Sequence, residues 1–340
     1  EDVVVRHTTT TVEGVTETVI RRDGDGRIAA ILADGIETRF SYDAACQLER
    51  SVRGDGLVSQ WRYDLSGRLV NESIDGFTAE LAYDAAGELR SRTDGAGTST
   101  YAYDGLGRRI ESVEPDGSVR SFEWSLRGWL TAVTAEDSSG APSRSELWVD
   151  ALGELADVDG TEVWWDSAEV APRVMSAGDQ SVVALPGGVT AIGGTVLSAG
   201  WRSAHPTKAG SPWGTASDAI PGLPSGLAVG ASGGLQVGGL DWLGARAYDP
   251  MTRGFLSVDP LDPVVGSGWS GNPYSYAGND PLHAIDPLGL RPVTEDELQA
   301  YRDGNNGAMA AAGDWFADNW EYIAGGAAVL VGGGRWIFGG

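Results

Sequence analysis

The residues best suited to chemistry lie between positions 240 and 290, where aspartate is repeatedly followed by proline. Five such pairs occur there, and they begin at Asp249, Asp259, Asp262, Asp280 and Asp286. Aspartate carboxyls can act as general acids and bases. An Asp-Pro pair is also an ordinary turn device, because proline disfavours helix in the preceding residue and aspartate caps turns. Taken singly, each pair is compatible with either interpretation.

Other kinds of site have few candidate residues in this chain. Cys46 is the only cysteine, which excludes an intrachain disulfide and a thiolate metal cluster. The three histidines, His7, His205 and His283, lie far apart in the sequence and do not suggest a zinc site. We therefore expect neither a metal nor a cofactor.

Charge and composition narrow the class of protein. The 340 residues include 48 Asp and Glu against 24 Lys and Arg, a formal net charge of −24. An acidic surface repels phosphate groups, so nucleic acid is not an expected partner. The apolar run Ala327 to Val331 is far shorter than the roughly 18 residues that suggest a membrane span. Fifty Gly and 13 Trp favour a turn-rich all-β protein.

A phrase of about twenty residues repeats along the first part of the chain. Its clearest copy runs from Tyr101 through Tyr103 and Asp104 to Gly107. The aspartates of successive copies are spaced by 20 or 21 residues, at Asp23, Asp43, Asp64, Asp84 and Asp104. Residues 178–240 differ, with paired glycines and prolines between short aliphatic runs, which predicts short strands and wide loops.

Each copy of the phrase can be interpreted as a hairpin with one aromatic face. Tyr101 and Tyr103 lie two residues apart and so face the same side of a strand. Asp104 accepts hydrogen bonds from the amides ahead of it, Gly107 supplies a positive φ, and an aliphatic such as Leu69 or Ile110 restarts the next strand. Only stacked neighbours can bury such a face. We expect a scaffold role for the Tyr-Asp pairs, full burial of both tyrosine positions, and one continuous antiparallel sheet to about residue 240.

These repeats resemble the YD-repeat (Rhs) family, whose repeats coil into a hollow β-shell, as in the shell of toxin-complex C subunits. Residues 240–290 resemble the Rhs-repeat-associated core of polymorphic toxins. The matching phrases are "RxYDPxxGRFLSxDP" at Arg246–Pro260, "NxYxYxxNxP" at Asn272–Pro281 and "DPxGL" at Asp286–Leu290. The order Arg253-Gly254 departs from the first phrase, in which glycine comes first.

The resemblance implies intramolecular aspartyl proteolysis by Arg246, Asp259 and Asp286, with the cut between Leu290 and Arg291. Two neighbouring carboxyls cannot both ionise cheaply, so they share one proton. The ionised carboxylate then activates water, the protonated one donates to the carbonyl oxygen, and the arginine is the organising cation.

Two further residues of the terminal phrase, Pro287 and Gly289, support the motif. The alternative is structural: Asp259 and Asp286 would cap turns, and Arg246 would be their ion-pair partner.

The sequence as a whole therefore predicts an all-β fold, in which a coiled YD-repeat shell is capped by a core plug and followed by a short helical tail. We expect a YD-repeat shell at 1–190, glycine-rich closing strands and loops at 191–239, the core autoprotease at 240–290, and the start of a released cargo at 291–340. Thr294 and Glu297 have the spacing of a capping box at a helix start.

The function implied by the resemblance is a shell that encloses a C-terminal toxin or effector and releases it by self-cleavage. The expected partners are the chain's own cargo and a secretion apparatus or N-terminal parts of a longer protein, in a secreted or cell-surface bacterial setting. One alternative is a cell-surface adhesion module without proteolysis. Another is a carbohydrate-binding solenoid, which needs contiguous exposed tryptophans that we expect to be buried.

Overall fold

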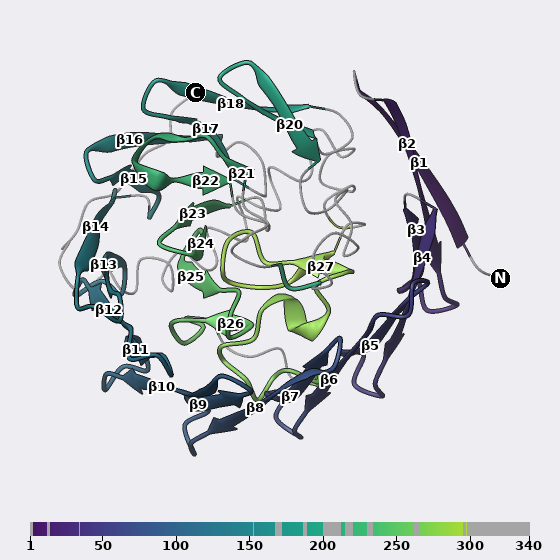
Figure 1. The fold of residues 1–340 in the computed structure, drawn as a ribbon, viewed down its shortest axis with the longest axis horizontal. Coiled ribbons are helices and arrows are strands. Elements are labelled where there is room, and N and C mark those ends of the chain that lie inside the picture. Colours follow the sequence, from purple (N-terminus) through teal and green to yellow (C-terminus); the bar gives the residue numbers. More distant parts are fainter. Residues whose placement is uncertain are drawn as a thin grey trace, which may run out of the picture.

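A curved antiparallel sheet encloses a smaller second sheet in this protein (Figure 1). The computed structural model describes residues 3–11, 14–33, 35–151, 153–166, 172–185, 189–199, 212–214, 220–229, 234–261, 266–294 and 297. Within these residues the first sheet has 20 strands, and each strand pairs with the next along the chain. The predicted all-β fold class is confirmed.

The strands of the first sheet follow one another in short hairpins. They are β1 (Val3–Thr11), β2 (Gly14–Arg22), β3 (Ile28–Ala33), β4 (Ile36–Tyr42), β5 (Leu48–Arg53), β6 (Val58–Tyr63), β7 (Leu69–Ile74), β8 (Phe77–Tyr83), β9 (Leu89–Asp94), β10 (Gly97–Tyr103), β11 (Arg109–Val113), β12 (Val119–Trp124), β13 (Leu130–Glu136), β14 (Pro142–Val149), β15 (Leu155–Val158), β16 (Thr161–Asp166), β17 (Arg173–Ala177), β18 (Gln180–Leu185), β19 (Val189–Ile192) and β20 (Thr195–Ala199). This connectivity makes the sheet a meander, as stacked hairpins require.

The turn between repeats is built around the aspartate of the Tyr-Asp pair. Asp64 Oδ1 accepts the N–H groups of Ser66 at 2.9 Å and Arg68 at 3.0 Å. Equivalent contacts, to the residues two and four positions later, occur at Asp23, Asp43, Asp84 and Asp104. Gly67 closes the turn at φ 76°, and Cys46 takes the same conformation, at φ 63°, in the degenerate copy. The aspartates therefore accept the turn amides, as predicted.

A β-bulge separates the two aromatic positions of each repeat. In β6 the register shifts between Arg62 and Tyr63, so that Trp61 is fully buried while Tyr63 is half-buried. The Tyr63 hydroxyl donates to the carbonyl of Leu48, in the preceding repeat, at 2.9 Å. Full burial is thus confirmed for the first aromatic and wrong for the tyrosine, because the bulge turns the ring toward that carbonyl.

The strand after each turn between repeats begins with a buried residue, five positions beyond Asp23, Asp43, Asp64, Asp84, Asp104, Ser125 or Asp150. Aliphatic side chains fill this position in most repeats, at Ile28, Leu48, Leu69, Leu89, Leu130 and Leu155. In the repeat of Asp104 the position belongs to Arg109, which is 1% exposed, whereas Ile110 is 38% exposed. The prediction for Ile110 is wrong, because the fixed turn length directs residue 109 to the interior.

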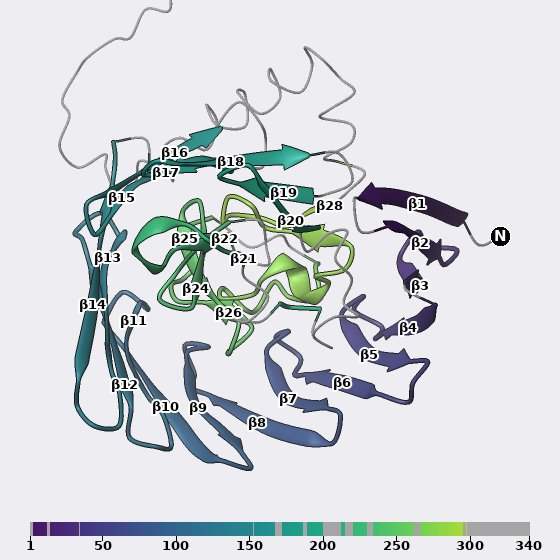
Figure 2. The same ribbon diagram turned by 45° about the horizontal axis from the view of Figure 1, so that its top comes forward.

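The second sheet lies inside the curve of the first (Figures 1 and 2). Its strands are β21 (Ile220–Pro221), β22 (Ala228–Val229), β23 (Leu235–Val237), β24 (Leu240–Leu243), β25 (Arg246–Asp249) and β26 (Gly254–Phe255), and a separate pair is β27 (Ala284–Ile285) with β28 (Val293–Thr294). Every residue of β23, β24 and β25 is buried. The expected continuous sheet to about residue 240 is therefore wrong, since strands without an exposed face belong to an interior layer.

Two apolar clusters join the sheets. One contains Phe122 and Leu155 of the first sheet with Leu235 and Trp242 of the second. The other joins Trp61 and Tyr101 to residues of the second sheet such as Tyr248. The first sheet, which we call the strip, and the second sheet inside its curve therefore share their apolar cores.

The last described residues, Thr294 and Glu297, test the predicted start of the helical tail. Thr294 N–H donates to Glu297 Oε2 at 2.7 Å, and Glu297 N–H donates to Thr294 Oγ1 at 3.3 Å, which are the two reciprocal bonds of the predicted capping box. The remainder of the tail lies outside the described residues. No helix among the described residues is long and apolar enough to cross a membrane. The domain boundaries at 190, 239 and 290 stay predictions.

Two tryptophans provide a matched test of the shared core. Trp61 is fully buried, with its ring centroid 4.7 Å from that of Trp213, whereas Trp148 is 62% exposed, as is Trp164, contrary to the expected burial. Trp61→Ala should lower the free energy of unfolding by about 3–5 kcal/mol, and Trp148→Ala by less than about 0.5 kcal/mol. Urea unfolding followed by circular dichroism measures both, and equal losses would contradict the shared core.

Candidate functional site

Arg246 lies at the centre of a buried polar cluster within the second sheet. It begins β25 and is only 2% exposed. Its Nη2 atom lies 2.8 Å from Asp259 Oδ2 and 3.2 Å from Asp286 Oδ2. The three residues singled out in the sequence, which span forty positions, therefore meet at one guanidinium nitrogen.

The rest of the guanidinium is also engaged. Nη1 donates to the carbonyl oxygen of Pro273 at 3.1 Å, and Nε donates to the carbonyl oxygen of Gly289. The Phe255 ring covers one face of the group, with its centroid 3.7 Å from Cζ. Because each nitrogen has an acceptor and the ring fills the space beside it, Arg246 has one defined orientation.

Asp286 follows β27 directly and sits at the start of the loop that leads to β28. Its Oδ1 accepts the N–H of Leu290 at 2.8 Å and the N–H of Arg291 at 3.1 Å. Asp286 is 1% exposed and Leu290 is 4% exposed. The amide of the predicted Leu290–Arg291 cleavage site is therefore in direct contact with one of the predicted carboxyls.

The terminal phrase is shaped to fit against β24 and β25. Pro287 begins its turn, and Gly289 has φ 63°. A Cβ on Gly289 would overlap the Leu243 carbonyl oxygen and lie 2.9 Å from Arg246 N. This close approach explains the glycine of the phrase, because a side chain would push the loop away from Arg246.

Asp259 is the more accessible of the two carboxyls. Its side chain is 18% exposed, against 1% for Asp286. Its backbone N–H donates to the Pro273 carbonyl at 2.9 Å, and its Oδ1 accepts the N–H of Leu261 at 2.9 Å. Asp259 is thus held by backbone contacts on one side and by Arg246 on the other.

Burial dominates the electrostatics of the cluster. It raises the pKa of Asp286 to about 6, with a further rise from the neighbouring Asp259 and an opposing effect of Arg246. It also raises the pKa of Asp259, against the effect of Arg246. For Arg246 burial lowers the pKa even though two carboxylates oppose the change. Two carboxyls with raised pKa values beside one cation can hold a proton near neutral pH.

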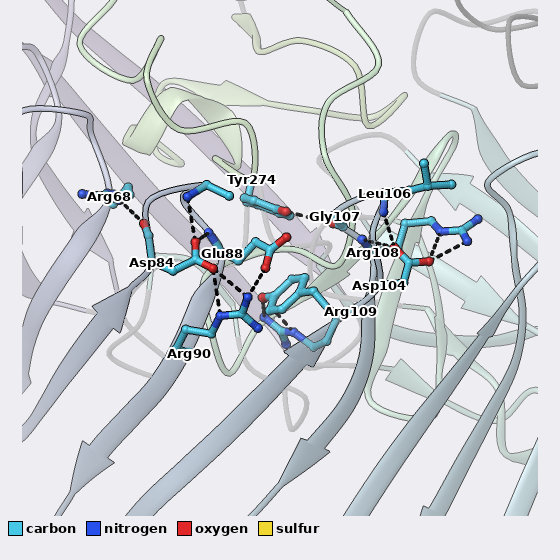
Figure 3. Close-up of polar contacts among 12 residues, drawn as sticks. Arg68, Asp84, Glu88, Arg90, Asp104, Leu106, Gly107, Arg108, Arg109 and Tyr274 are labelled. Atoms are coloured by element: carbon cyan, nitrogen blue, oxygen red, sulfur yellow. Dashed lines mark hydrogen bonds and ion pairs between the residues drawn. The ribbon is translucent and has the colours of Figure 1, made fainter.

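The second phrase, from Asn272 to Pro281, docks the core onto the turns of the shell. Tyr274 OH donates to the Gly107 carbonyl at 2.8 Å, as Figure 3 shows, and Asn279 Nδ2 donates to the Gly67 carbonyl at 2.7 Å. A Cβ on Gly107 would lie 2.6 Å from Val258 Cγ2. The neighbours of Asp259 along the chain and in space are therefore set by the repeat turns.

Three ion pairs between the shell and the core were not predicted from the sequence. Arg109 Nη1 lies 2.8 Å and Arg120 Nη2 lies 3.5 Å from Asp249 Oδ2, and Arg253 Nε lies 3.3 Å from Glu72 Oε2. One available signal was the arginine at a repeat position that is otherwise aliphatic. The reversed Arg253-Gly254 order was another, since Arg253 adopts φ 60°.

Metal ligation has no visible basis in the described parts of the chain. No group of three or more His, Cys, Asp and Glu residues there is placed to hold a metal ion. His283 Nδ1 lies 3.2 Å from Arg22 Nη1, and Cys46 is exposed. The two carboxyls beside Arg246, one of which contacts the Arg291 N–H, can support acid–base chemistry on that amide.

Comparison with known proteins gives one short match in sequence and several in shape. The RHS Repeat family matches residues 83–119, and no curated protein sequence matches significantly. A TcdB2-TccC3-Cdc42 crystal structure is similar over 82% of this chain and 22% of that chain, at 15% identity and a TM-score of 0.38. The Photorhabdus luminescens Tc holotoxin pore is similar over 82% of this chain and 21% of that chain, at 16% identity and a TM-score of 0.39. This chain thus spans about a fifth of each of those chains.

Two glycines test the fit of the terminal phrase. Gly289 and Gly239 both have positive φ, but a Cβ on Gly239 meets nothing within 4 Å. Gly239→Ala should therefore cost only the backbone strain, about 1 kcal/mol, whereas Gly289→Ala should cost about 1–3 kcal/mol more through overlap. Thermal unfolding of both variants measures the difference. Equal losses would mean that the loop is not pressed against Leu243 and Arg246.

Proposed function

We propose, from the premise that this chain is an Rhs/YD-repeat protein, that it is a self-cleaving shell. Asp259, Asp286 and Arg246 hydrolyse the chain's own Leu290–Arg291 bond, once per molecule, and separate the shell from the segment that follows. The observation that carries the proposal is the contact of Asp286 Oδ1 with the N–H of Arg291, on a carboxyl that shares Arg246 Nη2 with Asp259.

Asp259 is suited to the role of general base. Its partial exposure lets a water molecule reach it, while Asp286 is enclosed. Burial raises the pKa of Asp259, and Arg246 opposes that rise by favouring the ionised form, which is the form that accepts a proton from water. The oxygen of that water attacks the carbonyl carbon of Leu290.

Asp286 is suited to the role of general acid. Its pKa of about 6 leaves it partly protonated in mildly acidic and neutral solution, and it touches the nitrogen that must leave. As the tetrahedral intermediate collapses, its proton passes to the Arg291 nitrogen and the C–N bond breaks. The products are a carboxyl at Leu290 and an amine at Arg291, and the proton taken by Asp259 restores the shared proton of the pair.

Arg246 has an orienting role in this mechanism. It binds both carboxyls and also the carbonyl oxygen of Gly289, one residue before the bond to be cut. A single rigid cation thus sets the distance between the acid, the base and the substrate loop. Such positioning avoids the loss of translational and rotational entropy that a bimolecular reaction incurs.

Encapsulation of the following segment is the second part of the proposal. The β27–β28 hairpin that bears the bond lies within the curve of the first sheet (Figures 1 and 2). We propose that this segment begins a toxin or effector cargo, delivered from a secreted or cell-surface bacterial protein.

Isosteric amides test the chemistry. Asp259→Asn and Asp286→Asn should each leave the chain intact, because an amide cannot exchange the required proton. The unaltered chain should yield a fragment that begins at Arg291. Intact mass under denaturing conditions and N-terminal sequencing measure both results, and the cleaved fraction should not depend on protein concentration.

The matched control for these variants is Asp280→Asn, which changes a buried Asp-Pro aspartate whose Oδ1 accepts the N–H of His283 and which lies outside the set of groups bound to Arg246. It should cleave normally. A fragment beginning at Pro287 would instead indicate simple acid lability of the Asp286–Pro287 bond, and cleavage that survives Asp259→Asn would exclude the carboxyl pair.

The pH dependence of cleavage follows from the pKa of Asp286. An acid with a pKa of about 6 loses its proton as pH rises through that value, and each further unit lowers the protonated fraction about tenfold. The rate constant should therefore fall between pH 6 and pH 8 when full-length chains, kept unfolded in urea from their synthesis, are refolded into buffers of different pH. Asp280 also titrates in this range, with a pKa of about 7. The Asp280→Asn variant is therefore the control, and its pH profile should be unchanged if Asp286 causes the fall in rate. A flat profile would contradict the assignment of Asp286 as the acid.

A further inference from the structure

Arg109 is an exception in the repeat pattern. It occupies the position five residues after the turn aspartate, where other repeats bury a leucine or isoleucine, and it is 1% exposed. Figure 3 shows it beside the turn formed by Asp104 to Arg108. An arginine that faces the interior of a shell must find its partners there, because an unpaired buried charge is strongly destabilising.

The partners of Arg109 belong mostly to the core. Nη1 binds Asp249 Oδ2 at 2.8 Å, Nη2 donates to Thr252 Oγ1 at 3.2 Å, and its backbone N–H donates to the Leu256 carbonyl at 2.8 Å. Asp249 is completely buried. Burial opposes ionisation of Asp249, but Arg120 and Arg109, together with hydrogen bonds from Met251 and Thr252, lower its pKa. The residue thus joins shell and core through both side chain and backbone.

This contact reaches the candidate site through a single short strand. Asp249 ends β25, and Arg246 begins it. Leu256, whose carbonyl accepts the Arg109 N–H, donates its own N–H to the Ala247 carbonyl at 2.9 Å. The strand is therefore held at one end by Arg109, with Arg120 Nη2 3.5 Å from the same Asp249 oxygen, and at the other end by the two carboxyls of the site.

We infer that Arg109 is a positioning residue for the self-cleavage, which it controls by holding the strand that presents Arg246. This inference rests on the proposed function. A buried ion pair is weak evidence for stability, since two apolar residues of similar size often serve as well, but it defines one register of the core against the shell. Cleavage then waits until the repeat that carries Arg109 has folded around the core.

The test compares neighbouring arginines. Arg109→Met removes the ion pair, Arg109→Lys keeps the charge, and Arg108→Met is the matched control. Arg108 contacts Asp104 and the Ser125 carbonyl, both in the shell. Full-length chains made by cell-free translation are followed for the cleavage rate constant, and resistance to added protease gives the folded fraction. Per folded chain, we expect Arg109→Met to slow cleavage at least about tenfold, Arg109→Lys to recover most of the rate, and Arg108→Met to stay within about twofold.

Several outcomes would overturn the inference. Folded Arg109→Met chains that cleave at the normal rate would do so, as would equal slowing by Arg108→Met or no recovery with Arg109→Lys. If Arg109→Met does not fold, Asp249→Asn tests the same contact with little change of shape and should also slow cleavage. Asp259→Asn is measured in parallel. Normal cleavage in that variant would mean that the proposed carboxyl mechanism itself has failed, whatever Arg109 does.

Discussion

Each repeat of the strip has an apolar face that two strands cannot bury by themselves, and the interior sheet supplies the missing cover. Trp61 and Tyr101 of the strip share one cluster with Tyr248 and Phe255 of the core. Burial of large aromatic side chains is among the strongest favourable contributions to folding. The curvature of the strip and the placement of the core are therefore mutually dependent, and the Phe255 ring that covers Arg246 belongs to the same contact.

Ion pairs specify one position of the core against the apolar face of the strip. Arg109 of the strip meets Asp249 of the core, while Glu72 of the strip meets Arg253 of the core. The two pairs have opposite polarity, so a core shifted by one repeat would leave ions buried without partners, at a cost of several kcal/mol each. Glycines at the turns add a steric restriction, since a Cβ on Gly67 would lie 2.6 Å from the Gly268 carbonyl oxygen. Together these contacts specify a register that apolar packing alone leaves open.

Contacts within a repeat were predictable, and contacts between distant repeats were not. The Asp64 turn follows from residue types within five positions, because its acceptor and donors are neighbours in the chain. The meeting of Arg246, Asp259 and Asp286 was anticipated through phrases that resemble a known family, since spacing alone also allowed turn caps. No local pattern pairs Arg109 with Asp249 across 140 positions. The bulge before Tyr63 was missed for a related reason: strict alternation along a strand is broken by one unpaired residue.

The hairpin that bears the candidate bond has a consequence for what happens after a cut. Residues Ala284 and Ile285 pair with Thr294 and Val293, on either side of the loop. A cut within that loop would leave these backbone bonds in place, each worth only about 0.5–1.5 kcal/mol. What changes is the linkage, because β28 would then be tethered by pairing instead of by covalent chain. Cleavage and release are then separate events. A small force on the C-terminal segment would break the β27–β28 hydrogen bonds and detach β28 from the shell.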